Sequence, residues 1–506
     1  MAASEDTGTL LQQAVQLHQQ GRLEQAQALY RRVLEGAPRQ FDALHLLGVI
    51  ERQRGDPATA AQLIAEALQV DPSQARAHCN LGAALQDLGR SREALEAYEA
   101  ALRLDPQYAM AWNNRGNALR RLGRLGDALD SYERALGFKP SYPEAWCHRA
   151  IVLGDLGRHA DAAASARQAL AARPRYPEAA SALGNALQAM ERLAEAIDAY
   201  DRALEAAPER AETWCARGAA LKKRGDFEAA LASYERALAL RPDYGLAEHY
   251  RANALRALGR REQAVAAYRR ALALGADAGE IGFALSALGE GRPPEAAPAD
   301  YVKNLFDQYA GHFDHHLVEV LGYRTPALLD ALLRRHGVAP AAAPSWRVAD
   351  LGCGTGLCAP FLRPLAARLD GVDLSQKMLD KARETGLYDE LACADIVDWL
   401  AGQAGACDLV LAADVLVYLG ALDALFARAR AALRPGGHFA FSCEALEGEA
   451  AAAGYAILPS NRFAHALPYV EARARTAGFT LVEAERAVLR REHETEVAGW
   501  LVLLRA

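Results

Sequence analysis

Apolar and polar residues follow one helical pattern over the first 278 residues, and that pattern recurs every 34 residues. Alanine recurs at a helix-face position of each copy. In most copies tyrosine recurs at a second helix-face position, glycine in the middle and proline near the end. Glycine accepts a left-handed backbone and proline cannot continue a helix, so the two residues mark a turn and an end. The period therefore predicts two helices per copy, joined at the glycine and stacked along the chain.

Few copies depart from this pattern. The turn position is occupied by Gly21, Gly55, Gly89, Gly123, Gly157, Gly225 and Gly259, with Glu191 as the exception. The tyrosine position is occupied by Tyr30, Tyr98, Tyr132, Tyr200, Tyr234 and Tyr268. The pattern resembles the tetratricopeptide repeat, with eight copies that begin near residues 7, 41, 75, 109, 143, 177, 211 and 245.

The resemblance implies a helical superhelix over residues 7–278, with a concave groove lined by the first helix of each copy. Amide and basic side chains at the inward positions would suit a peptide backbone, an acidic peptide or a C-terminal carboxylate. They are Asn80, Asn114, Asn117, Asn185, Asn253, Arg120, Lys222, Lys223 and Arg256. We expect a protein or peptide partner in this groove; the alternative is that these side chains form solvated helix faces.

Charge and cysteine content limit the partners and the kinds of site that we expect. The formal net charge is −7 over 506 residues, which gives no whole-chain reason to expect nucleic acid or an anionic membrane as a partner. The N-terminus lacks the basic and apolar segments of a secretion signal, so we expect a cytoplasmic protein. Eight cysteines without CxxC pairs predict neither a disulfide framework nor a zinc site.

The chain changes character after the repeats. Residues 279–300 are expected to form a closing helix and a proline-rich linker. Over residues 301–506, apolar runs alternate with helical patterns, which predicts an α/β domain with a parallel sheet. The expected fold class is thus α followed by α/β: a tetratricopeptide superhelix and then a Rossmann-like domain.

A glycine-rich turn follows the first predicted strand of the second domain. Asp350 ends that strand, and Gly352, Gly354 and Gly356 follow it, so backbone N–H groups gather at the strand tip. Asp373 ends the next strand, 17 residues beyond Gly356, where its carboxylate can accept hydrogen bonds from ribose hydroxyls. A dinucleotide site would need another glycine at position 357, which is leucine, so a dehydrogenase is disfavoured.

The D-x-G-x-G-x-G spacing resembles motif I of the class I S-adenosylmethionine-dependent methyltransferases, and three further strand motifs follow in that family's order. The resemblance covers residues 301–506 and implies S-adenosylmethionine as cofactor, with Tyr309 and Phe313 in a lid over it. The implied cofactor contacts are Tyr309, Asp350, Gly352, Cys353, Gly354, Gly356, Asp373, Leu374, Asp395, Ile396 and Asp414. The alternative is an α/β domain without a ligand, in which the glycines are accidental.

The acceptor site is expected after the fourth and fifth strands. Asp414 and Tyr418 follow the fourth strand, and Arg462, His465 and Tyr469 follow the fifth. As catalytic candidates, His465 would deprotonate or orient the acceptor, and Arg462 would hold a carboxylate or phosphate. The alternative is that these residues cap the helix that follows.

Metal and thiol chemistry are not expected. His312, His315 and His316 lie within one helical turn, and no cluster of carboxylates and histidines elsewhere in the sequence partners them. Cys353 and Cys358 are interpreted as packing residues rather than reactive thiols.

These patterns together predict a methyltransferase whose repeats recruit a protein substrate or a partner that carries the substrate. One alternative is a small-molecule methyltransferase in which the repeats serve assembly only. Another is an interaction scaffold that binds the cofactor without turnover.

Overall fold

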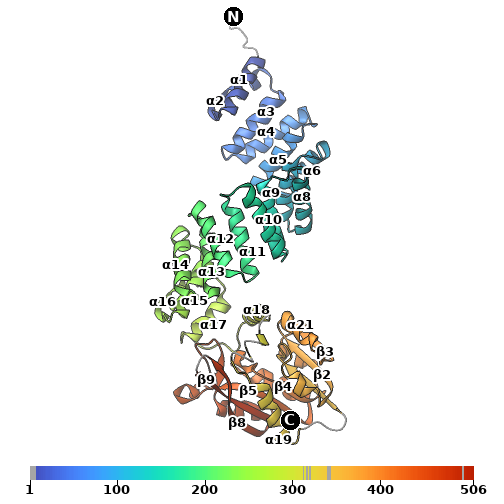
Figure 1. Ribbon diagram of the computed structural model, residues 1–506, viewed down its shortest axis with the longest axis vertical. Coiled ribbons are helices and arrows are strands. Elements are labelled where there is room, and N and C mark those ends of the chain that lie inside the picture. The colour runs from blue at the N-terminus through green and yellow to red at the C-terminus, as the bar shows by residue number, and fades with distance from the viewer. Residues whose placement is uncertain (1–6, 311–312, 315–316, 318–320, 339–343, 493–494) are drawn as a thin grey trace. The chain divides into compact units, whose positions relative to one another are not determined.

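The computed structural model describes residues 7–310, 313–314, 317, 321–338, 344–492 and 495–506. The chain divides into two compact units, Met1–Arg260 and Arg261–Ala506. Figure 1 shows helical hairpins in the first unit and a sheet with helices in the second. Among the described helices, none has both the length and the apolar composition that a membrane crossing requires.

The first unit confirms the predicted repeat fold, because its helices follow the period of the sequence. The first helices of the hairpins are α1 (Thr7–Gln19), α3 (Phe41–Gln53), α5 (Ala75–Asp87), α7 (Ala109–Arg121), α9 (Pro143–Asp155), α11 (Pro177–Ala189), α13 (Ala211–Arg224) and α15 (Gly245–Ala257). The second helices are α2 (Leu23–Gly36), α4 (Pro57–Val70), α6 (Ser91–Leu104), α8 (Leu125–Phe138), α10 (His159–Ala172), α12 (Leu193–Ala206) and α14 (Phe227–Leu240).

Several repeats share a close contact between a glycine and a tyrosine. A Cβ atom added to Gly82 would lie 2.6 Å from the Tyr98 ring, and one added to Gly116 would lie 2.5 Å from the Tyr132 ring. Both tyrosines are fully buried. The aromatic ring therefore takes the space that a side chain would need, which explains why the two residues recur 16 positions apart.

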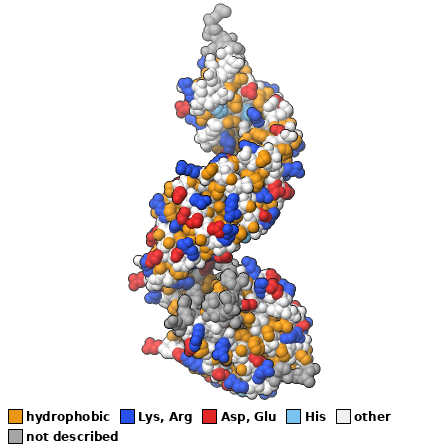
Figure 2. Space-filling view, in the orientation of Figure 1, with side chains coloured by type: hydrophobic (Ala, Val, Ile, Leu, Met, Phe, Trp, Pro, Cys, Tyr) orange, Lys and Arg blue, Asp and Glu red, His pale blue; other side chains and the backbone are white. Residues whose placement is uncertain are grey.

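The turn glycines have the left-handed backbone that the sequence predicts, with φ of 75° at Gly21 and 92° at Gly225, and Glu191 adopts 57° at the same position. On the face shown in Figure 2, acidic and basic side chains are interspersed over the hairpins. Exposed ion pairs such as Arg124 with Asp127 add only about 0.2–1 kcal/mol each, so buried apolar packing stabilises the stack.

The second unit contains helices and one mixed sheet. Its helices are α16 (Arg261–Ala273), α17 (Ala278–Ala287), α18 (Ala299–Tyr309), α19 (Thr325–Arg335), α20 (Ala359–Leu362), α21 (Gln376–Glu384), α22 (Ile396–Ala401), α23 (Asp423–Ala432) and α24 (Leu467–Thr476), with 3-10 turns η2 (Leu416–Tyr418) and η3 (Gly448–Ala453). Its strands are β1 (Trp346–Leu351), β2 (Ala366–Asp373), β3 (Glu390–Cys393), β4 (Cys407–Ala412), β5 (Leu433–Ala445), β6 (Tyr455–Ile457), β7 (Phe463–His465), β8 (Thr480–Glu492) and β9 (Thr495–Arg505).

The sheet confirms the predicted Rossmann-like fold. Its parallel part has the order β3-β2-β1-β4-β5, so the carboxyl ends of these strands share one edge. Strand β9 runs antiparallel to β5, and β8 pairs with β9. The short β7 continues beside the end of β5, and β6 pairs with β7. The helix after the glycine turn, α20, is short because Pro364 prevents its continuation.

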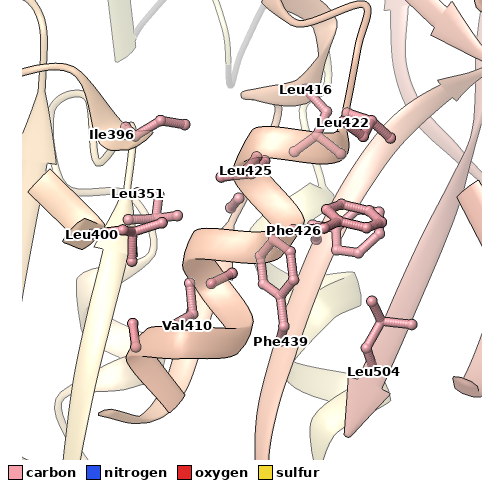
Figure 3. Close-up of a cluster of buried hydrophobic side chains, with 14 of the residues drawn as sticks. Leu351, Ile396, Leu400, Val410, Leu416, Leu422, Leu425, Phe426, Phe439 and Leu504 are labelled. Atoms are coloured by element: carbon pink, nitrogen blue, oxygen red, sulfur yellow. The ribbon is translucent and has the colours of Figure 1, made fainter. Parts of the chain in front are cut away.

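Neighbouring strand residues face opposite sides of the sheet and enter two separate cores. Val410 and Phe439 pack under α22, α23 and α24, whereas Leu409 and Ala440 pack under α19 and α20. Figure 3 shows Phe426 of α23 beside Phe439, and their ring centroids are 5.7 Å apart in an edge-to-face arrangement. These two cores fix the strands whose ends carry the candidate site.

The segment expected as a closing helix and linker packs on the sheet domain. Phe283 of α17 is buried, with ring centroids 5.3 Å from Tyr301 and 5.9 Å from Phe463. Further along, the Ala297 N–H donates to the Tyr418 carbonyl at 2.9 Å. Residues 295–297, which we call the strap, therefore lie against the chain that follows β4.

Candidate active site

The glycine turn after β1 forms one end of a cavity of about 640 Å³. Gly352, Gly354 and Gly356 all have positive φ, at 61°, 55° and 95°. A Cβ on Gly352 would clash with Val415 at 2.5 Å, whereas among the described residues only the Phe313 ring would come within 4 Å of a Cβ on Gly354. Gly352, Cys353 and Gly354 line the cavity, so the turn presents its backbone to a ligand there.

Asp373 at the end of β2 lines the same cavity and fixes the turn. Its carboxylate accepts hydrogen bonds from Gly354 N–H at 3.0 Å and from Ser375 N–H at 2.8 Å. Burial raises the pKa of this carboxyl, while the N–H donors act in the opposite direction. Leu374 follows it on the cavity wall. The arrangement suits a ribose, whose hydroxyls would meet an acceptor already held in place.

Asp350 and Gly356 lie behind this surface and are not among the described cavity-lining residues. The Tyr388 hydroxyl donates to Asp350 at 2.6 Å, and burial raises the pKa of Asp350 to about 7. Gly356 lies close to Tyr388 and Thr385. Both residues shape the turn from behind, and direct contact of either with the cofactor stays a prediction.

Asp395 and Ile396, after β3, complete the wall expected to meet the nucleoside. Asp395 caps α22 by accepting hydrogen bonds from the Val397 and Asp398 N–H groups at 2.8 and 3.1 Å. Its carboxylate therefore has a defined position, and Ile396 adds an apolar surface beside it.

The predicted lid residues, Tyr309 and Phe313, line the cavity, and their ring centroids are 5.9 Å apart. Two carboxylates that the sequence did not single out fasten this region. Asp307 accepts a hydrogen bond from the Ser375 hydroxyl at 2.5 Å, and Asp314 accepts one from Thr355. The lid is thereby tied to the turn and to β2.

A buried ionic network lies beside the cavity, after β4. Arg490 donates to Asp414 at 3.1 Å and also to Glu444, and its side chain is only 1% exposed. Asp414 and Arg490 line the cavity. Asp414 has a φ of 57°, and Ser442 Oγ accepts a hydrogen bond from its N–H at 2.9 Å. An irregularity in the β8–β9 pairing falls between Val488 and Arg490, where a change of register can re-aim a side chain.

Arg462 is the catalytic candidate that the structure brings to the cavity. It belongs to the tight β6–β7 loop, closed by a hydrogen bond from Leu458 N–H to its carbonyl at 2.8 Å. Its guanidinium hydrogen-bonds the Tyr418 hydroxyl and lies 3.9 Å from Glu444. Asn461 holds the loop by donating to the Tyr301 hydroxyl at 3.2 Å.

His465 and Tyr469 are not among the described residues that line the cavity. His465 is fully buried, its Nε2 hydrogen-bonds the Gly420 carbonyl at 3.2 Å, and burial lowers its pKa to about 4. The Tyr469 hydroxyl accepts a hydrogen bond from Leu422 N–H at 3.1 Å. Both brace the chain that follows β4, which corrects the prediction that they act on the acceptor.

The two cysteines near the cavity are buried, which agrees with their interpretation as packing residues. Cys353 and Cys358 are buried, and burial raises the pKa of both well above the usual range, so neither thiol is poised as a thiolate. His312, His315 and His316 lie outside the described residues.

The predicted groove residues of the repeats carry contacts of their own. Asn117 and Asn185 accept hydrogen bonds from Tyr132 and Tyr200, at 2.8 and 2.7 Å. Each asparagine oxygen is thus oriented by the tyrosine of its own repeat. Asn185 also lines a hollow of about 450 Å³ together with Lys223 and the tyrosines Tyr200, Tyr244 and Tyr250.

Comparisons with known proteins match both units. A family model described as a methyltransferase domain matches residues 349–439. Models described as tetratricopeptide repeats match residues 11–75, 79–143, 148–211, 211–244 and 252–281.

Individual relatives share parts of the chain. Trans-aconitate 2-methyltransferase of Paracidovorax citrulli is 41% identical over 92 residues, 18% of this chain and 35% of that protein. Ubiquinone biosynthesis O-methyltransferase of Aromatoleum aromaticum is 31% identical over 121 residues, 23% of this chain and 50% of that protein. The solved structure of pilF from Pseudomonas aeruginosa is 23% identical, covers 42% of this chain and 97% of that one, and has a TM-score of 0.38. The chain spans half or less of the two curated relatives, and it carries tetratricopeptide repeats followed by a methyltransferase domain.

Proposed function

We propose that the chain is an S-adenosylmethionine-dependent methyltransferase whose repeats recruit a protein substrate or a partner that carries the substrate. The observation that carries the proposal is the convergence of the glycine turn, Asp373, Asp395 and Asp414 on one cavity from four strand ends. The names of the two curated relatives, both methyltransferases, support it.

The residues present fit this cofactor. Gly354 leaves space over the turn, and Asp373 and Asp395 hold carboxylates where a nucleoside would bind. When bound, S-adenosylmethionine supplies a methyl group that is already activated for transfer. The protein then has to align the acceptor and exclude water, which is the role we assign to Tyr309, Phe313 and the walls of the cavity.

Recruitment by the repeats rests on their groove. The oriented asparagine oxygens and Lys223 beside the 450 Å³ hollow would suit a peptide segment, and a cytoplasmic location is part of the proposal. A second candidate is a small-molecule methyltransferase in which the repeats serve assembly only. The printed names of the curated relatives, trans-aconitate and ubiquinone methyltransferases, favour it.

Calorimetry with the full chain tests the cofactor assignment. We expect S-adenosylmethionine to bind, and Asp373→Ala to weaken binding by about 1–3 kcal/mol through loss of charge-assisted hydrogen bonds. Asp127→Ala, at an exposed pair with Arg124 in the repeats, is the control and should retain affinity. Equal affinity in Asp373→Ala, or preferential binding of NAD, would refute the site.

A further inference from the structure

We propose that the methyl acceptor is a carboxylic acid with an apolar body. This inference rests on the proposed methyltransferase function. The acceptor's carboxylate binds Arg462 on the β6–β7 loop, and its apolar part lies against α18. The carboxylic acid would bind the part of the cavity that Arg462 lines.

Two arginines lie close together at the cavity wall because a buried carboxylate lies between them. Arg490 donates to Glu444, and Arg462 lies 3.9 Å from the same carboxylate. Glu444 is 3% exposed and is not among the described lining residues, whereas both arginines are. The carboxylate therefore supports both guanidinium groups from behind, with Arg462 held from the side by the Tyr418 hydroxyl.

The cavity lining carries both acidic and basic side chains. Asp373, Asp395 and Asp414 line it together with Arg462 and Arg490. Arg490 is bonded to Asp414 and Glu444, so Arg462, which lies 3.9 Å from Glu444, is the guanidinium that we assign to an anionic acceptor. Because Asp414 and Glu444 flank the arginines, a group with a single negative charge is favoured over a phosphate, which carries about −1.5 to −2. A planar carboxylate also matches the guanidinium fork.

The wall facing these arginines is apolar. Val302, Leu305 and Phe306 of α18 line the cavity, as does Leu419 after β4. The Phe306 and Tyr418 ring centroids are 5.5 Å apart, edge to face. Leu305 is still 38% exposed, so an apolar acceptor would cover surface that the fold leaves accessible.

Matched acids and amides test the class without knowledge of the natural acceptor. The full chain is saturated with S-adenosylhomocysteine and titrated calorimetrically with 3-phenylpropionate, octanoate and the amides of both. We expect each acid to bind about ten-fold or more tightly than its amide, because only the acid makes charge-assisted hydrogen bonds. Acetate, which lacks the apolar body, should bind more weakly than either acid.

Arginine variants show whether the preference comes from this site. Arg462→Gln should abolish the advantage of the acids and leave S-adenosylhomocysteine affinity unchanged, which also shows that the variant is folded. Arg434→Gln, at an exposed pair with Asp408, should retain the advantage. Equal or undetectable binding of acids and amides, an advantage that survives in Arg462→Gln, or tighter binding of phenyl phosphate would overturn the proposal. Failure of the wild-type chain to bind S-adenosylhomocysteine would instead overturn the methyltransferase function on which it rests.

Discussion

Arg490, Asp414 and Glu444 form a buried ionic network in which the arginine bonds both acids. Removing one partner of a buried ion pair leaves an uncompensated charge, which costs about 3–5 kcal/mol. Burial raises the pKa of Glu444, and the neighbouring Arg490 counteracts that effect by favouring the charged form. The network thus fixes the position of Asp414 at the tip of β4.

At the same scale, His465 makes stability depend on pH. Its folded pKa of about 4 lies below the ordinary value of 6.5, so between these values the unfolded chain binds the proton that the folded chain does not. The stabilisation is therefore fully present above pH 6.5 and is lost as the pH falls toward 4. Lowering the pH from 7 to 5 therefore reduces the free energy of unfolding of the wild-type second unit. We predict that this loss is about 2 kcal/mol smaller in His465→Gln.

Scanning calorimetry measures the difference in pH dependence between the two proteins. The unfolding transition of the second unit is identified as the one that S-adenosylhomocysteine shifts. Groups other than His465 titrate in both proteins, so their contributions cancel in the comparison. Identical pH slopes for the wild-type and variant transitions would contradict the assignment of a neutral, buried His465.

Local sequence was sufficient to predict that the glycine turn and the end of β2 meet, but not the buried ionic network. Gly352, Gly354 and Asp373 could be predicted to lie together because one turn and two adjacent strands bring them to the same cavity. Arg490 could not, since it meets Asp414 across 76 residues, on a strand whose register shift no local pattern marks. His465 was misassigned because its residue type suggests a base, whereas only the fold shows that it is buried.

Among the elements, α17 and the strap pack on β7 and on the chain that follows β4. Phe283 packs on Phe463, which directly follows the loop that carries Arg462, and the strap pairs with Tyr418. Proline content suggested a linker here, because composition does not reveal which backbone groups pair. The repeats, in contrast, could be predicted helix by helix, since 34-residue periodicity reflects contacts between neighbours.

We predict that Phe283→Ala destabilises the second unit by about 3–5 kcal/mol, the usual cost of truncating a buried phenylalanine. Phe138→Ala, at a side chain that is 44% exposed in the repeats, should leave that transition unchanged. We also expect a fragment of residues 301–506, which lacks α17 and the strap, to be less stable than residues 261–506. Equal midpoints of thermal unfolding for the two fragments would show that α17 and the strap contribute nothing to the domain.

Across the whole molecule, two units with different designs have different roles in the proposal. The repeats present a surface built from near-identical hairpins, whereas the second unit gathers its polar side chains at one sheet edge. Recruitment raises the local concentration of a target and leaves the chemistry to the second unit. In this proposal the repeat surface selects the target, and the cavity selects the atom that is methylated.

The most direct test of methyl transfer uses S-adenosylmethionine labelled in its methyl group, incubated with a bacterial cell extract and the purified full chain. We expect label to enter an acceptor, and to enter it much more slowly with Asp373→Ala at subsaturating cofactor. Label in a protein band would support recruitment by the repeats, and label in a solvent-extractable acid would support the small-molecule alternative. If the wild-type chain binds the cofactor but no label is transferred, the chain is a cofactor-binding scaffold and the proposed activity is contradicted.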